Sequence, residues 1–264
     1  MPLIAVGIIF ALILLGAQWL KGALLGPDPS AITDWLSTIP FQIIEIALAL
    51  IVLRYEGVPL HGIGLSPRRI LPAVLTMLAV VVVLNIALAA LLAMGGAQLN
   101  FGFFSYLRVE PFNLSTLAIV AGMVKFYLFV GPAEELLFRG YLQNKLISLF
   151  AGNGRAPRLR VALAILVAAM LFAFVHVPGL LAQGAGFGGV AGSLVVLVFS
   201  GLTFGIIYHI TRNLYFVALL HGIGDHWPLF VEPTSWPNWP LLGVVYALAV
   251  LGYWLWSKRS GAGV

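Results

Sequence analysis

The side chains best able to do chemistry in this chain are two adjacent glutamates, Glu134 and Glu135, in the stretch GPAEELLFRGYLQNK. Asp and Glu together number only 9 of 264 residues, yet this pair directly follows the apolar stretch STLAIVAGMVKFYLFV. Successive residues of a helix point about 100° apart. Glu135 and Arg139, four residues apart, share a face. We therefore expect Glu135 to form a salt bridge with Arg139 and Glu134 to face a different neighbour.

Two histidines and an aspartate extend this set. His176 lies four residues after Phe172 in LFAFVHVPGL, where Pro178 is expected to end or kink the helix. A short basic turn joins the helix of Glu134 to the helix of His176, which favours antiparallel neighbours. The two residues stand at similar distances from that turn, so we expect them at similar depth in one shared site.

His221 and Asp225 form a second i,i+4 pair, in YFVALLHGIGDHW. A carboxylate at this spacing can orient the imidazole or share a metal with it. The chain contains no cysteine, and it has no Gly-x-Ser-x-Gly motif. A carboxylate and imidazoles instead suit the activation of water by a general base or by a metal. Glu134, His176, His221 and Asp225 are the candidate Zn²⁺ ligands, and a metal-free reaction stays equally open.

Four other polar residues fall within or beside apolar stretches. We assign no chemical role to Glu45, whose nearest basic residue in the sequence is Arg54, or to Lys125. His209 and His226 are interpreted as residues of the membrane interface.

The composition shows what must position these residues. Hydrophobic residues make up 61% of the chain and charged residues 9%, against about 25% charged in soluble domains. Apolar runs of about 20 residues are long enough to cross a bilayer as helices. The sequence therefore predicts an all-α, polytopic membrane bundle of about eight transmembrane helices. We expect them at 2–20, 37–53, 70–94, 115–130 running into 132–150, 160–178, 188–208, 213–227 and 239–257.

The loops predict how this bundle lies in the membrane. Basic residues gather in alternate loops, which places both termini in the cytoplasm and makes the chain a multi-pass protein of the cell membrane. The net charge of +5 resides in short connections, which suits lipid headgroups and not nucleic acid. No internal repeat and no long linker divides the chain, so residues 1–264 are expected to form a single transmembrane domain.

Three motifs together resemble a known family. EELLFR at 134–139 matches EExxxR, FAFVH at 172–176 matches FxxxH, and HGIGD at 221–225 matches Hxxx(N/D). Their order and spacing resemble those of the CAAX protease and bacteriocin-processing family, also called Abi, which includes the type II CAAX prenyl endopeptidases. The resemblance covers roughly residues 115–230 and implies that this region is a catalytic core.

The resemblance implies an intramembrane endopeptidase. Glu134 and His176 would activate a water, while His221 and Asp225 would stabilise the oxyanion or help hold a metal. Glu135, Arg139 and Phe172 would support the site. The last motif position is Asn in the prenyl endopeptidases, and an ionised Asp cannot donate a hydrogen bond to an oxyanion. Asp225 therefore favours orienting His221 or binding a metal.

The expected substrate is a hydrophobic or lipidated peptide, of the CAAX type or another, reached from the lipid bilayer. The same resemblance allows a non-catalytic bacteriocin-immunity protein or membrane scaffold. A more distant alternative is a proton-coupled transporter in which Glu134, His176 and Asp225 relay protons. Transporters commonly have repeated halves, and none is evident here.

Overall fold

The computed structural model describes residues 16, 31–94, 120–151, 157–226, 247–248 and 250–255. These residues form helices and turns, with no strand among them, so the expected all-α class is confirmed. Within this part of the chain, four helices are long and apolar enough to cross a membrane, at Ser37–Tyr55, Leu60–Met94, Arg158–Ala182 and Phe187–Thr211. The count of about eight is not confirmed: the expected span 2–20 and most of 239–257 lie outside the described residues.

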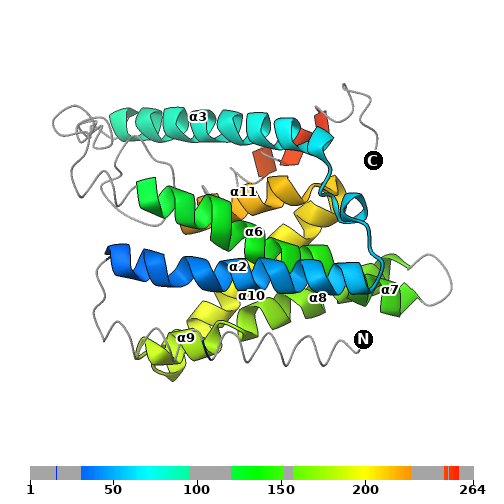
Figure 1. Cartoon of the computed structure of the whole chain (residues 1–264). Coiled ribbons are helices and arrows are strands. Elements are labelled where there is room, and N and C mark those ends of the chain that lie inside the picture. The colour runs from blue at the N-terminus through cyan, green and yellow to red at the C-terminus, as the bar shows by residue number, and fades with distance from the viewer. Residues whose placement is uncertain are drawn as a thin grey trace.

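Figure 1 shows the described helices, coloured in chain order from blue to red. Helix α2 covers Ala31–Tyr55, two 3₁₀ turns cover Leu60–Ile63 and Pro67–Arg69, and α3 covers Ile70–Met94. The middle of the chain forms α6 (Gly131–Glu135) and α7 (Asn144–Ala151). Helices α8 (Arg158–Phe174), α9 (Val177–Ala182), α10 (Phe187–Thr211) and α11 (Leu214–Asp225) follow. Residues 250–255 are also helical.

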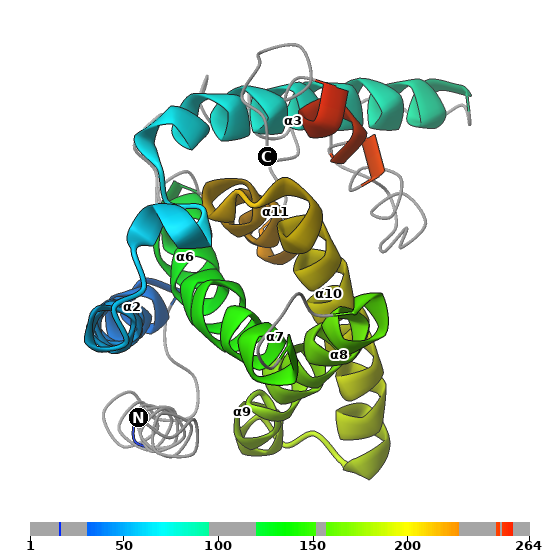
Figure 2. The ribbon, with the colours of Figure 1, turned by 90° about the vertical axis from the view of Figure 1, so that its right-hand side faces the viewer.

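Helix α11 lies at the centre of the packing. It contacts α6 on one side and α3 on the other, while α2 packs against α6 and α8 packs against α10. Figure 2 shows α3 lying beyond α11, with α6, α8 and α10 on the opposite side. The outward face of α3 carries exposed Leu71, Leu78, Val82 and Ile86. In a bundle of this composition, that apolar face is suited to contact lipid tails.

The helix that carries the two glutamates is continuous and contains two π-helical segments. Residues 120–124 lead into a π-helix at Lys125–Val130, then α6, then a second π-helix at Leu136–Gln143, and then α7. Segment α6 begins at Gly131 and has Pro132 in its first turn, and it continues the helix before it, as the expected run of 115–130 into 132–150 predicts for the described residues. Proline lacks the N–H of a normal helical hydrogen bond, and the widened turns before it let the chain continue as a helix. Glu134 and Glu135 therefore sit between two π-helical segments.

Close helix contacts at two glycines fix the spacing of the bundle. A Cβ atom at Gly131 would lie 2.5 Å from the carbonyl oxygen of Ala218 in α11, and one at Gly201 would lie 3.0 Å from the Cα of Ala169 in α8. The distance at Gly131 is shorter than real side-chain atoms show, so this approach requires glycine, whereas the distance at Gly201 is a tight contact that a larger residue would have to relieve by moving its neighbour. The first glycine brings α6 against α11, and the second brings α10 against α8.

A buried asparagine fixes the start of α11. The Asn213 Oδ1 atom accepts a hydrogen bond from the backbone N–H of Phe216 at 3.2 Å, which caps the helix. Its Nδ2 atom donates to the carbonyl of Arg69 at 2.9 Å and to the hydroxyl of Tyr253 at 3.1 Å. One side chain thus joins the start of α3, the start of α11 and the helix near the C-terminus. This anchor sets the direction of the helix that carries His221 and Asp225.

Candidate active site

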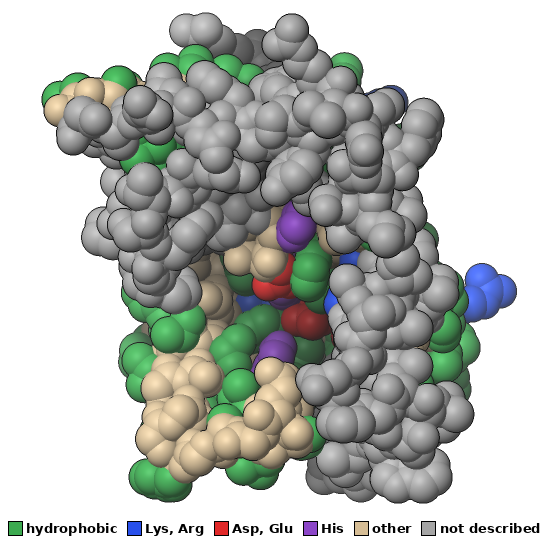
Figure 3. Space-filling model, turned by 90° about the vertical axis from the view of Figure 1, so that its left-hand side faces the viewer, with side chains coloured by type: hydrophobic (Ala, Val, Ile, Leu, Met, Phe, Trp, Pro, Cys, Tyr) green, Lys and Arg blue, Asp and Glu red, His purple; other side chains and the backbone are tan. Residues whose placement is uncertain are grey.

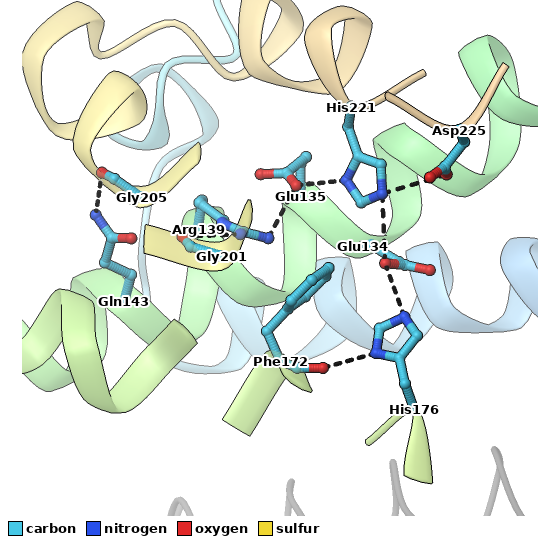
Figure 4. A network of polar contacts seen from close by, with 10 residues as sticks. All are labelled: Glu134, Glu135, Arg139, Gln143, Phe172, His176, Gly201, Gly205, His221 and Asp225. Carbon is cyan, nitrogen blue, oxygen red and sulfur yellow. Dashed lines mark hydrogen bonds and ion pairs between the residues drawn. The ribbon is translucent and has the colours of Figure 1, made fainter. Parts of the chain in front are cut away.

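Glu135 forms the buried centre of a polar network (Figure 4). Its carboxylate is 0% exposed and its Oε1 atom accepts from the Arg139 Nη1 atom at 2.8 Å, the salt bridge expected from the i,i+4 spacing. The same Oε1 atom lies 2.6 Å from the Nδ1 atom of His221. The contact with His221 was not expected from the sequence, because it joins two helices far apart in the chain. Glu135 therefore holds both the arginine and one of the histidines.

Arg139 ties this network to the surrounding helices. Its Nη2 atom donates to the carbonyl of Gly201 at 3.2 Å. The guanidinium lies 4.6 Å from the ring centre of Phe172 and 5.5 Å from that of Phe204. A cation placed against aromatic rings is stabilised when it is removed from water. Arg139 thus links α8 and α10 to the helix of the two glutamates.

His221 is fixed from all sides. Its ring stacks on Phe204 at 5.1 Å between centres and meets the edge of Phe172 at 5.9 Å. Because the Glu135 carboxylate is an acceptor, the Nδ1 atom of His221 is the donor in that bond. The Nε2 atom then faces the Oε2 atom of Glu134 at 3.6 Å and the Oδ2 atom of Asp225 at 3.4 Å. The Nδ1 atom of His221 is therefore bonded to Glu135, and its Nε2 atom points toward Glu134 and Asp225.

His176 reaches the same point from the opposite side. It stands at the break between α8 and α9, immediately before Val177 and Pro178, so the predicted interruption of this helix is present. Its backbone N–H bonds to Ala173 rather than Phe172, and the freed carbonyl of Phe172 lies 2.7 Å from its Nδ1 atom. The Nδ1 atom must therefore carry the proton. Its Nε2 atom faces the Oε2 atom of Glu134 at 3.9 Å.

Glu134 is the point on which both histidines converge. Its Oε2 atom is buried and makes no hydrogen bond to the described residues, while the two Nε2 atoms stand 3.6 and 3.9 Å away. Direct hydrogen bonds to nitrogen are about 2.7–3.2 Å long. Contacts of 3.6 and 3.9 Å are too long for direct hydrogen bonds and too short for a water on the line between the atoms, so a water bonded to them would lie beside that line. The three atoms are thus placed around a position that one small polar molecule could occupy.

Two cavities meet at this position. One has a volume of about 650 Å³ and is walled by α2, α9 and the first half of α10. The other has a volume of about 1230 Å³; its walls are mainly apolar residues of α10 together with Ala247, Val250, Leu251 and Trp254, and α11 adds polar side chains to it. Glu134 and His176 line both cavities, while His221 and Asp225 line the second. Figure 3 shows acidic and histidine side chains at the floor of a hollow on one face of the molecule.

The structure brings together all seven residues that the motifs single out, and it adds others. Phe204 and Gly201 on α10 contact His221 and Arg139 respectively. Glu45 on α2 is 3% exposed and lines the smaller cavity beside Glu134. The sequence did indicate that Glu45 deserved notice as a functional candidate, because an ionisable residue inside an apolar span is rarely without a function. It did not indicate which other helix Glu45 would face.

The remaining polar candidates lie apart from this group. Lys125 lies 5.0 Å from the ring centre of Phe126, and the ring of His226 stacks on the same phenylalanine at 5.9 Å. His209 lies near the end of α10, half-buried, among the residues that precede Arg212. None of these three is among the residues lining the two cavities.

The candidate zinc ligands were tested against the geometry of the site. Among the described residues, no group of three or more His, Asp or Glu side chains is arranged to hold a metal ion. Glu134, His176, His221 and Asp225 are close together, but in this arrangement their atoms do not form such a set.

One comparison with known proteins identifies the region around this site. Residues 115–227 match the family model described as type II CAAX prenyl endopeptidase Rce1-like. No curated protein and no solved structure matches the chain. The matched region is less than half of the chain, and it contains the three motifs and every residue of the network in Figure 4. The chain therefore carries, at residues 115–227, a domain of the type II CAAX prenyl endopeptidase Rce1-like family, which is the family that its motifs predict.

Proposed function

We propose that this protein is an intramembrane endopeptidase that uses Glu134 to activate a water for attack on a peptide bond. The domain at 115–227 belongs to a protease family, and its described helices are apolar enough to cross a membrane. The observation that carries the proposal is the convergence of both imidazole Nε2 atoms on the Oε2 atom of Glu134. A water held there would contact a general base and two imidazoles at once.

The reaction would begin with proton transfer to Glu134. Glu134 Oε2 would take one proton from the water as its oxygen attacks the peptide carbonyl. His176, whose Nδ1–H is held by the Phe172 carbonyl, presents its Nε2 lone pair toward the water and would orient it. When the C–N bond of the tetrahedral intermediate breaks, Glu134 would return its proton to the leaving nitrogen. Glu134 alone would then carry the proton from the water to the amine, and no second acid or base would be needed.

His221 would stabilise the negative charge that forms on the carbonyl oxygen. When its ring carries both protons, the Nδ1–H donates to Glu135 and the Nε2–H points between Glu134 and Asp225. A donor already oriented toward the developing charge lowers the barrier, because it needs no reorganisation. Asp225 is an acceptor when ionised, so its role in this proposal is to orient His221.

The proposed substrate is a CAAX-type or other hydrophobic peptide. The larger cavity is lined by apolar side chains such as Phe199, Ile206, Ile210 and Leu251, and these could accept a lipid chain or apolar side chains. The scissile bond would lie where the two cavities meet, beside Glu134 and His176.

The test is cleavage of an internally quenched peptide that ends in a farnesylated CAAX sequence. Glu134→Gln keeps the size of the side chain but cannot accept a proton, so the rate should fall by about 10²–10⁴-fold. Glu56→Gln is the matched control, because Glu56 pairs with Lys145 at 2.6 Å and is not among the residues lining either cavity. Equal cleavage by wild type and Glu134→Gln would refute the assignment.

Adding a chelator to the same assay distinguishes a metal-dependent reaction from a metal-free one, both of which the family resemblance allows. We expect treatment of the purified wild type with EDTA to leave cleavage unchanged, because Glu134 can accept the proton of the water and the described side chains are not arranged to hold a metal ion. Loss of activity on chelation and recovery with Zn²⁺ would replace the general-base route by a metal route. A wild type that is folded but cleaves no peptide would instead favour a non-catalytic membrane scaffold or immunity protein.

A further inference from the structure

The smaller cavity has a polar wall that the proposed reaction does not use. Gln42 and Glu45 lie three residues apart on α2, so they share one face of that helix. Both line the cavity of about 650 Å³, together with Glu134 and His176. Helix α2 packs against α6, which explains how a helix outside the matched family region reaches the site.

Both side chains present an unsatisfied acceptor to this cavity. The Oε1 atom of Gln42 and the Oε1 atom of Glu45 are buried and have no hydrogen-bond partner among the described residues. Glu45 itself is only 3% exposed. Leaving a buried acceptor unpaired is destabilising, and more so for a charged group. Two such atoms on one cavity wall therefore indicate a ligand that supplies hydrogen-bond donors.

The chemistry of the wall limits what this ligand can be. A carboxylate offers acceptor sites alone, and Glu134 adds a second carboxyl group to the same cavity. A ligand group that carries negative charge would meet two carboxyl groups and neither a lysine nor an arginine among the residues lining this cavity. An extended peptide, by contrast, presents a backbone N–H at every residue except proline, and each of these needs an acceptor once it leaves water.

We infer that Gln42 and Glu45 bind the peptide substrate by accepting hydrogen bonds from its backbone N–H groups on one side of the scissile bond. This inference rests on the proposed function, because a peptide cut at Glu134 must extend into the cavity that Glu134 shares with α2. Glu45 is then a substrate-binding residue. Its unpaired state in the free protein is resolved when substrate enters.

A structural role and a substrate-binding role predict opposite effects on stability. Glu45→Leu replaces an unpaired buried acceptor by an apolar group of similar size. If Glu45 only awaits substrate, this change should leave the thermal midpoint in detergent unchanged or raise it, because buried polar groups kept for function often reduce stability. If Glu45 instead supports the fold, the midpoint should fall.

The kinetic test uses the internally quenched farnesylated CAAX peptide with wild type, Glu45→Leu and Gln42→Leu. We expect Glu45→Leu to raise KM by about 10- to 100-fold with kcat little changed, since the lost bond is made equally in the ground and transition states. Asn85→Leu is the matched control, because Asn85 is a buried polar residue that bonds to the Val81 carbonyl at 2.9 Å and lines neither cavity. It should leave KM unchanged.

A set of peptides N-methylated at one backbone nitrogen at a time tests the specific contact. One of these peptides should bind wild type poorly and show no further rise in KM with Glu45→Leu, because the donor is already absent. The inference is overturned if Glu45→Leu leaves KM unchanged, or if it raises KM equally for every N-methylated peptide. If Glu45→Leu does not fold, Gln42→Leu decides by the same comparison. A wild type that cleaves nothing refutes the proposed function, whereas an active wild type with an unaffected Glu45→Leu refutes this inference alone.

Discussion

Replacing Arg139 by methionine tests whether the buried network serves the fold. Arg139 is 1% exposed and Glu135 is 0% exposed, so the change leaves a carboxylate in an apolar interior. Breaking a buried ion pair by removing one partner costs about 3–5 kcal/mol. The hydrogen bond to Gly201 and the contact with the Phe172 ring are lost as well. Two effects reduce this loss of stability: His221 still donates a hydrogen bond to Glu135, and the methionine side chain fills part of the space left by the arginine. We therefore expect a loss of about 4 kcal/mol in the free energy of unfolding.

The assay is reversible unfolding of the purified protein in mixed micelles with an increasing fraction of SDS, followed by circular dichroism. Lys145→Met is the control, because it removes the cation of a partly exposed pair with Glu56 and should cost at most about 1 kcal/mol. The double variant Glu135→Gln with Arg139→Met should recover part of the loss, since no buried charge is left without a partner. If Arg139→Met costs less than about 1 kcal/mol while peptide cleavage disappears, the reasoning is refuted and Arg139 takes part in the chemistry.

Two further predictions concern Asp225 and Gly131. Asp225→Asn removes the charge of the carboxylate that lies 3.4 Å from the Nε2 atom of His221 and orients it, so kcat/KM on the farnesylated peptide should fall about 10-fold; an increase would instead assign position 225 to donation toward the oxyanion. Gly131→Ala forces a Cβ atom within 2.5 Å of the Ala218 carbonyl and should lower the unfolding free energy by about 1–3 kcal/mol. Gly188→Ala, whose Cβ would meet nothing within 4 Å, should be neutral or stabilising in the same measurement.

Local spacing in the sequence was enough to predict part of the site. The Glu135–Arg139 salt bridge follows from helix geometry alone, because both partners lie on one turn of one helix. The approach of His176 to Glu134 followed from a short connection between two helices, which limits how far their depths can differ. The all-α membrane class followed from composition, since so few charged residues cannot cover a soluble domain.

Contacts between helices far apart in the chain were beyond the sequence. Nothing in the spacing of Glu135 and His221 indicates that they meet, because the rotation of α11 depends on anchors such as Asn213 and on the close approach at Gly131. The position of Glu45 in the site could not be predicted for the same reason, because its side of α2 could equally have faced lipid. The two π-helical segments on either side of Pro132 also could not be foreseen, since they have no clear signature in the residues.

The walls of the two cavities have an evolutionary consequence. Residues 115–227 contain the groups to which we assign the proposed reaction, but Gln42 and Glu45 on one side, and Ala247, Val250, Leu251 and Trp254 on the other, lie outside that region. Mutations in these flanking helices can alter which peptides fit without disturbing the carboxylate and imidazoles that would cut them. Substrate preference can therefore diverge among relatives that keep the same three motifs, and sequence searches built on the motifs alone would not detect the divergence. Swapping α2 between two such relatives would be a direct way to exchange their preferences.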